Sequence, residues 1–85
     1  MTITMNKFLN EVFRYAAHTF SVAYAKGTNY VLMRAWGEEH GLSEYFELAH
    51  KWYGITITCT ELSSGIVYRA EGDLWTVVFN FQRVE

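Results

Sequence analysis

The sequence contains a single cysteine, Cys59, and it lacks any long uninterrupted run of apolar residues. One cysteine cannot form an internal disulfide, and the first residues lack the continuous apolar stretch and small-residue cleavage site of a signal peptide. No window approaches the roughly 18 successive apolar residues of a membrane-spanning helix. We therefore expect a cytoplasmic protein that makes no contact with a membrane.

Basic residues are also few, since seven Lys and Arg stand against nine Asp and Glu, for a net charge of −2. Basic surfaces supply most of the affinity of proteins for nucleic acid, so this composition argues against nucleic-acid binding. The charge is uneven: residues 1–37 carry four basic residues and one acidic residue, whereas residues 38–85 carry three and eight. Such polarity can orient a partner or a second copy of the chain.

Apolar residues are plentiful at 51%, and they include three Trp, six Tyr and six Phe. A chain of 85 residues with this content can build a core without disulfides or a structural metal. We therefore expect residues 1–85 to form a single domain that needs no cofactor.

The N-terminal half shows helical periodicity. Apolar residues recur at helical spacing over residues 5–26, with Thr4 as the expected N-cap and Gly27 at the expected end. Residues 29–40 fit either a helix or a strand, and the shared faces within the segment favour a helix. A further helix is predicted from an N-cap at Ser43 to Gly54.

After Gly54 the apolar period changes to two, which indicates strands over residues 55–62, 66–71 and 74–81. A two-residue loop at 72–73 would place Glu71 opposite Leu74. The first hairpin needs a loop with an even number of residues, either 63–64 or 62–65, and we favour the longer one.

These elements predict an α+β fold, with two to three N-terminal helices packed on one face of a three-stranded antiparallel β-meander. Residues 74–81 read LWTVVFNF, with no charge, proline or glycine. A free edge of this kind pairs with any strand that it meets, so the segment must be covered by its own fold or by another chain.

Few residues suggest catalysis or metal binding. Glu47 and His50 have the i,i+3 spacing of a carboxylate and an imidazole on one helix face, but a metal site needs three or four ligands. Because His18 and His40 add no convergent ligand, we interpret all three histidines as surface residues. Cys59 lies on the predicted inward face of a strand, so we expect a buried structural thiol and no nucleophile.

The functional hypothesis is a small non-enzymatic module that binds another protein, such as a stoichiometric inhibitor. A phage anti-defence protein, for example an anti-CRISPR, and an immunity or antitoxin-type protein are the roles considered. The predicted contact residues lie on the outer face of the sheet and on acidic helix surfaces that would steer a basic partner: Val67, Arg69, Leu74, Thr76, Val78, Asn80, Glu38, Glu39, Glu44 and Glu47.

Two alternatives stay open from the sequence. The same surface could form a homodimer, either face to face or through pairing of the strand at 74–81 across a two-fold axis. The other alternative is a small nuclease-like toxin that uses His40 or His50 as an acid or base.

Overall fold

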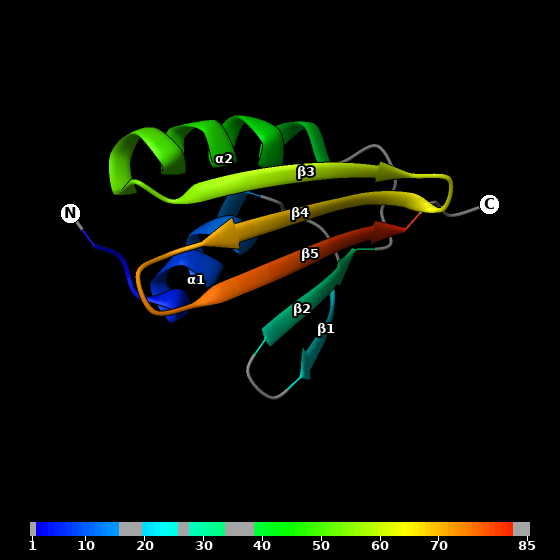
Figure 1. Ribbon diagram of the computed structural model, residues 1–85, viewed down its shortest axis with the longest axis horizontal. Coiled ribbons are helices and arrows are strands. Elements are labelled where there is room, and N and C mark those ends of the chain that lie inside the picture. Colours follow the sequence, from blue (N-terminus) through cyan, green and yellow to red (C-terminus); the bar gives the residue numbers. More distant parts are fainter. Residues whose placement is uncertain (1, 16–19, 26–27, 34–38, 83–85) are drawn as a thin grey trace.

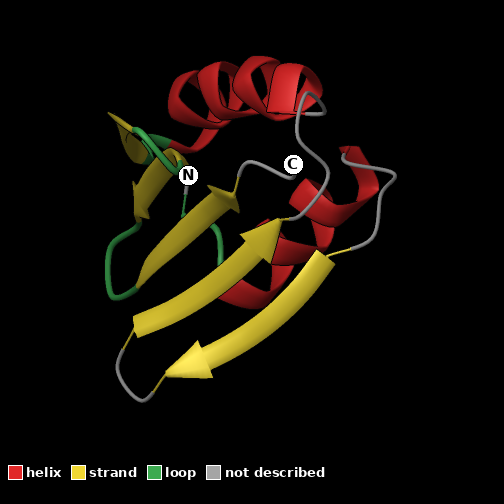
Figure 2. Cartoon of the chain, turned by 90° about the vertical axis from the view of Figure 1, so that its right-hand side faces the viewer, coloured by secondary structure: helices red, strands yellow, loops and turns green. Residues whose placement is uncertain are grey.

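The computed structural model describes residues 2–15, 20–25, 28–33 and 39–82, which form an α+β fold (Figure 1). In chain order the elements are α1 (Met5–Tyr15), β1 (Phe20–Ala25), β2 (Thr28–Met33), α2 (Glu39–Tyr53), β3 (Thr56–Leu62), β4 (Gly65–Glu71) and β5 (Thr76–Gln82). The strands form one sheet in the order β1-β2-β5-β4-β3. Both helices lie on the same side of this sheet, so the predicted class and the one-sided packing are confirmed (Figure 2).

Helix α1 begins as the sequence predicts. The backbone N–H of Lys7 donates to the hydroxyl of Thr4 at 3.3 Å, and the N–H of Phe8 donates to the Thr4 carbonyl at 2.9 Å. Thr4 therefore acts as the N-cap and satisfies a donor that the first helical turn leaves unpaired. The buried face consists of Phe8, Leu9 and Val12.

The prediction that residues 5–26 form one helix is wrong, as is the helix favoured for residues 29–40. Helix α1 ends at Tyr15, and β1 and β2 form an antiparallel pair from Phe20 opposite Met33 to Ala25 opposite Thr28. Gly27, the predicted helix end, lies outside the described residues. The apolar spacing of residues 20–33 fits both periods, and pairing with a distant strand decides between them.

That distant strand is β5, which contains most of the LWTVVFNF segment. Strand β2 runs parallel to β5, from Asn29 opposite Val77 to Met33 opposite Phe81. Strand β4 pairs with the other side of β5 in the antiparallel sense. Strand β5 is therefore an inner strand of the sheet, and homodimer formation by edge pairing of residues 74–81 is not available to this fold.

The β3–β4 hairpin has the predicted register. Leu62 lies opposite Gly65, so the loop is Ser63-Ser64 and has the even length that the pattern requires, although the favoured four-residue loop is wrong. In the β4–β5 hairpin, Glu71 faces Thr76 in place of the predicted Leu74. This shift of two residues moves Leu74 and Trp75 into the loop and leaves the side chains of β4 and β5 on their predicted faces.

Trp75 accounts for the longer β4–β5 loop. Its indole Nε1 donates to the carbonyl of Ile3 at 3.0 Å, and its ring stacks on Phe8 with a centroid separation of 5.1 Å. The indole also lies directly against Gly72, where an added Cβ would clash with the ring. The packing of Trp75 in the core thus replaces the strand pair that the sequence suggests.

The core between the helices and the sheet is largely aromatic. Phe8 lies at its centre, with ring centroids 5.9 Å from Tyr45, 6.4 Å from Phe46 and 6.2 Å from Phe79. Aliphatic residues from both layers fill the space around these rings, among them Leu42, Ile55, Val31 and Val77. Burial of rings of this size supplies much of the hydrophobic stabilisation of a small domain.

Helix α2 is longer than predicted at its start and ends where predicted. It begins at Glu39, so Ser43 lies inside the helix and the expected N-cap there is wrong. The end is at Tyr53, and the N–H of Gly54 donates to the carbonyl of His50 at 3.0 Å. Gly54 has φ of 68°, the left-handed conformation that glycine adopts without strain at helix ends.

We expect Gly72→Ala to lower the free energy of unfolding by about 1 to 3 kcal/mol, because the new methyl group would displace the Trp75 indole from its site. Urea denaturation followed by circular dichroism measures this change. Asp73→Ala is the matched control in the same loop, because Asp73 is exposed and its loss should change stability by less than about 0.5 kcal/mol. Equal stability of the two variants would contradict the packing described here.

Candidate functional site

The side of the sheet opposite the helices carries rows of side chains that cross the strands. One row contains Tyr30, Val78, Arg69 and Thr58, which are successive Cα partners on β2, β5, β4 and β3. No helix of the described segments covers this side (Figures 1 and 2). The row places an aromatic ring, an aliphatic group and a guanidinium group next to one another on an accessible face.

The neighbouring rows are of similar mixed character. Asn80, Val67 and Thr60 form one, and Thr76, Glu71 and Thr56 form the other. Arg69 and Glu71 form an ion pair at 2.9 Å, with 56% and 46% of their side chains exposed. We name the residues of these three rows the open sheet face.

Five of the six predicted sheet residues lie on the open sheet face: Val67, Arg69, Thr76, Val78 and Asn80. Leu74 does not, because it lies in the β4–β5 loop, where its side chain is 97% exposed. Tyr30, which is 38% exposed, was not among the predicted contact residues, because its segment was assigned to a helix. The alternating pattern around Tyr30 was compatible with a strand, and that was the only feature of the sequence that indicated a position on the sheet.

The predicted acidic residues lie away from the open sheet face. Glu44 and Glu47 are exposed on α2, and Glu39 is the first residue of that helix. Glu38 lies outside the described residues. Because α2 packs on the opposite side of the sheet, the structure separates the predicted contact residues into two surfaces.

A cavity of about 510 Å³ lies between α2 and β3. Four residues of one α2 face line it, and the remaining lining residues come from β3 and β4: Ser43, Phe46, Glu47, His50, Thr56, Ile57, Cys59 and Tyr68. The hydroxyls of Ser43 and Tyr68 share a hydrogen bond of 2.9 Å. We name this feature the α2–β3 cavity.

Cys59 is exposed in this cavity, so the predicted burial of its thiol is wrong. Its side chain does point to the helix side, as the alternation predicts. Burial falls along the strand with distance from the tight α2–β3 connection: Ile55 is buried, Ile57 is half-buried and Cys59 is exposed. Strand β3 is an edge of the sheet, and α2 does not cover its second half.

The histidines do not converge with other ligands in the part of the chain that the structure describes. No group of three or more His, Cys, Asp and Glu side chains there could hold a metal ion. Nδ1 of His50 lies 2.8 Å from the carbonyl oxygen of Ile55. A carbonyl oxygen can only accept a hydrogen bond, so Nδ1 carries the proton and donates it. His18 and the side chain of His40 lie outside the described structure, so the toxin alternative stays a hypothesis.

A second polar cluster joins the two helices. One carboxylate oxygen of Glu11 accepts hydrogen bonds from the hydroxyls of Tyr45 at 2.9 Å and Tyr53 at 3.3 Å. Burial, and then the hydrogen bond to the Glu11 carboxylate, raise the pKa of Tyr45 well above its ordinary value. Burial and the same carboxylate also raise the pKa of Tyr53. The cluster stabilises neutral tyrosines and is best explained as a structural link between α1 and α2.

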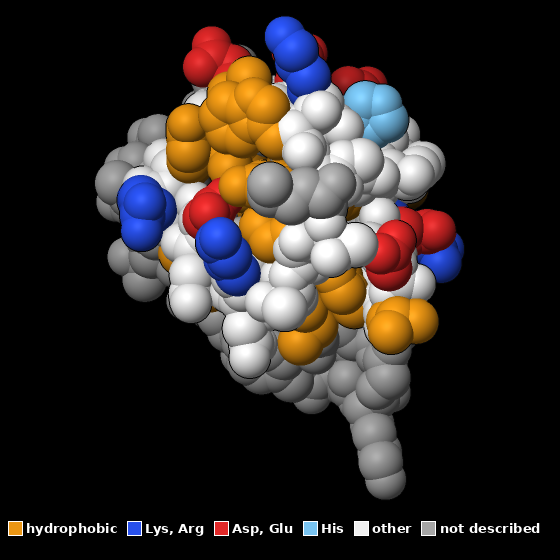
Figure 3. All heavy atoms as spheres, turned by 90° about the vertical axis from the view of Figure 1, so that its left-hand side faces the viewer, with side chains coloured by type: hydrophobic (Ala, Val, Ile, Leu, Met, Phe, Trp, Pro, Cys, Tyr) orange, Lys and Arg blue, Asp and Glu red, His pale blue; other side chains and the backbone are white. Residues whose placement is uncertain are grey.

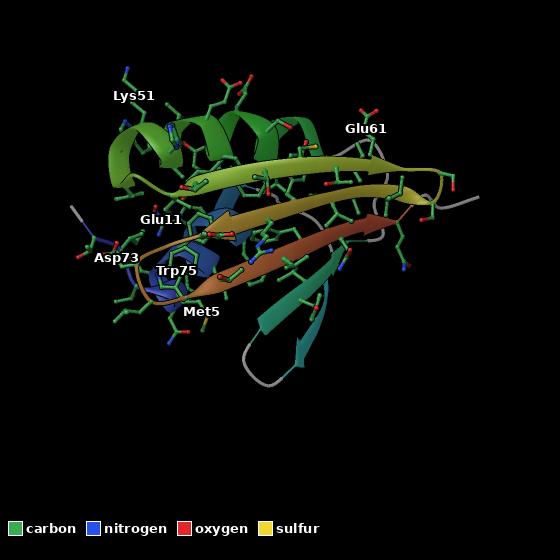
Figure 4. The ribbon with its side chains drawn as sticks, viewed as in Figure 1. Met5, Glu11, Lys51, Glu61, Asp73 and Trp75 are labelled. Atoms are coloured by element: carbon green, nitrogen blue, oxygen red, sulfur yellow. The ribbon has the colours of Figure 1, made fainter. Side chains whose placement is uncertain are left out.

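Exposed apolar side chains also occur at the end of the molecule where α2 ends. Trp52 is 49% exposed there, and the β4–β5 loop with Leu74 turns at the same end. Figure 3 shows that apolar groups on this end are interrupted by charged and polar side chains. Met5 and Trp75, both labelled in Figure 4, are half-buried and pack against the core.

Neither described helix is long and apolar enough to cross a membrane. Comparison of the chain with known protein families, curated proteins and solved structures finds no match.

The Glu11 cluster predicts an alkaline loss of stability. Tyrosine ionises near pH 10 in the unfolded chain, whereas the folded protein holds Tyr45 neutral to higher pH, so the unfolded state binds fewer protons above pH 10. The free energy of unfolding should fall there by up to about 1.4 kcal/mol per pH unit for each such tyrosine. Tyr45→Phe should be less stable at pH 7 and should show a smaller fall between pH 10 and 11.

Urea denaturation at pH 7, 9, 10 and 11 measures this dependence. Tyr30→Phe is the matched control, because Tyr30 lies on the open sheet face and should keep the fall seen in the unmodified protein. An equal fall in the Tyr45→Phe variant and the unmodified protein would contradict the role given to Tyr45.

Proposed function

We propose that the protein is a small module that binds another protein by stoichiometric contact and that the open sheet face is its contact surface. The observation that supports this proposal is the row of Tyr30, Val78 and Arg69 on a side of the sheet that no described helix covers. Tyrosine and arginine are the residue types that most often dominate binding energy in protein interfaces, and a partly apolar centre is typical of such surfaces.

The surroundings of this row fit the same role. Thr58 ends the row, and the hydroxyl and amide side chains of Thr60, Thr76 and Asn80 flank it, so that these groups can form the polar rim of an interface. The exposed Arg69–Glu71 pair can exchange its internal contact for contacts with a partner at little cost, because exposed ion pairs contribute at most about 1 kcal/mol.

Within this class, the role that we favour is that of an inhibitor. A phage anti-defence protein, such as an anti-CRISPR, or an immunity or antitoxin-type protein would act in this way, by covering a functional surface of its target. The acidic residues of α2 would act separately from the open sheet face, as a field that steers a basic partner during approach.

Affinity capture from the native host tests the proposal, with the folded protein as bait and mass spectrometry as the readout. The expected result is one protein partner that forms a complex of fixed stoichiometry, measured by size-exclusion chromatography with light scattering. Val78→Asp should weaken capture at least tenfold, because it replaces the apolar centre of the contact surface with a charge that binding would have to desolvate.

Arg69→Ala is a second variant, which removes a side chain that is already half exposed and so preserves the fold. Ser64→Asp is the matched control, because it adds the same negative charge in the β3–β4 turn, away from the centre of the open sheet face. Failure of folded bait to retain any specific macromolecule would contradict the proposal, as would capture that both face variants leave unchanged. A dimer in the light-scattering measurement that Val78→Asp dissociates would identify the partner as a second copy of the chain.

A further inference from the structure

The α2–β3 cavity has a floor and a rim of different chemistry. Phe46, Ile57 and Tyr68 form an apolar floor, and Phe46 is only 3% exposed. The rim carries hydrogen-bond acceptors. Glu47 contributes its carboxylate. His50 donates a hydrogen bond from Nδ1–H to the Ile55 carbonyl, so Nε2 of the neutral ring is free of a proton and is an acceptor.

The rim is also negative. Among the described residues that line the cavity, Glu47 carries the only charge when His50 is neutral. The neighbouring cation Lys51 extends away from the sheet (Figure 4) and does not line the cavity. A ligand that fits this charge distribution combines an apolar body with a cationic group that donates hydrogen bonds.

We propose that the α2–β3 cavity binds a small organic cation, namely an amine or a guanidinium compound with an aromatic or aliphatic body. The volume of about 510 Å³ is in the range of sites for small organic ligands, roughly 300 to 1,000 Å³. The apolar body packs on Phe46 and Tyr68, and the cation binds the Glu47 carboxylate. The open sheet face is a different surface, which among the described residues shares only Thr56 with the cavity, at the β3 edge of the sheet.

The walls of the cavity are held in place before any ligand arrives. The hydrogen bond of 2.9 Å between Ser43 and Tyr68 joins α2 to β4, and the bond of 2.8 Å from His50 to the Ile55 carbonyl joins α2 to the start of β3. Phe46 packs on Tyr68 with ring centroids 5.1 Å apart. A site whose walls are already fixed loses little conformational entropy on binding.

Cys59 provides a direct readout, because it lines the cavity and is the only cysteine of the chain. The rate at which iodoacetamide, a neutral reagent, alkylates Cys59 is measured by mass spectrometry in the presence of three probes of similar shape. The probes are phenethylamine as the cation, 2-phenylethanol as the neutral analogue and 3-phenylpropionate as the anion. We expect phenethylamine to protect Cys59 at a concentration about tenfold lower than 2-phenylethanol, a factor that corresponds to about 1.4 kcal/mol, and 3-phenylpropionate to protect least.

Glu47→Gln keeps the size of the side chain and removes its charge. In this variant the protection by phenethylamine should fall to that of 2-phenylethanol. Glu44→Gln is the matched control, because Glu44 is exposed on the same helix and does not line the cavity, so this variant should keep the preference for the cation. Alkylation rates without a probe are recorded for each variant, so that effects of charge on the reagent are separated from binding.

Equal protection by the three probes, or no protection by any of them, would overturn the proposal. So would a cation preference that Glu47→Gln leaves unchanged. A fourth probe, the peptide Gly-Gly-Arg-Gly-Gly, tests for a basic side chain of a protein as the natural occupant. Protection by this peptide at lower concentration than phenethylamine would overturn the assignment to a small molecule.

Discussion

The parallel pairing of β2 with β5 is the interaction on which the rest of this structure depends. Strand β5 is uncharged and rich in Val and Phe, and an unpaired edge of that kind would recruit another strand. Strand β2 occupies that edge from Asn29 to Met33 and converts β5 into an inner strand. The sheet then extends to five strands, and its edges become β1 and β3.

The pairing of β2 with β5 also determines which residues meet on each side of the sheet. On the helix side, Val31 of β2 and Phe79 of β5 are partners and are fully buried beneath the helices, in the core that Phe8 centres. On the other side, the same pairing brings Tyr30 next to Val78 and so assembles the mixed row of the open sheet face. The edge position of β3 leaves Cys59 accessible and opens the α2–β3 cavity. Both candidate surfaces are therefore consequences of strand order.

The sequence predicts those parts of the fold that local patterns determine. The period-two alternation after Gly54 yields the three C-terminal strands, their faces and the even hairpin loop, because these depend on residues close together in the chain. The start of α1 at Thr4 and the end of α2 at Gly54 follow from capping chemistry.

The errors arise where a distant contact decides between two local possibilities. Residues 20–33 fit a helix or strands, and only β5, more than forty residues away, selects strands. Trp75 does not pair with β4, because its indole packs on Phe8 and donates a hydrogen bond to the carbonyl of Ile3. Neither contact can be predicted from the hairpin sequence. For the same reason Tyr30 was missing from the predicted contact residues, and Cys59 was predicted to be buried beneath a helix that does not reach it.

Amide hydrogen exchange of β5, measured by NMR on dilute protein, tests the central claim most directly. In a strand between two neighbours, successive backbone N–H groups point alternately to one neighbour and to the other. The structure predicts slow exchange for every amide from Val77 to Phe81, at rates that do not change with protein concentration. Fast exchange at every second residue, or protection that appears only as the concentration rises, would show that one edge of β5 is free and would contradict the account.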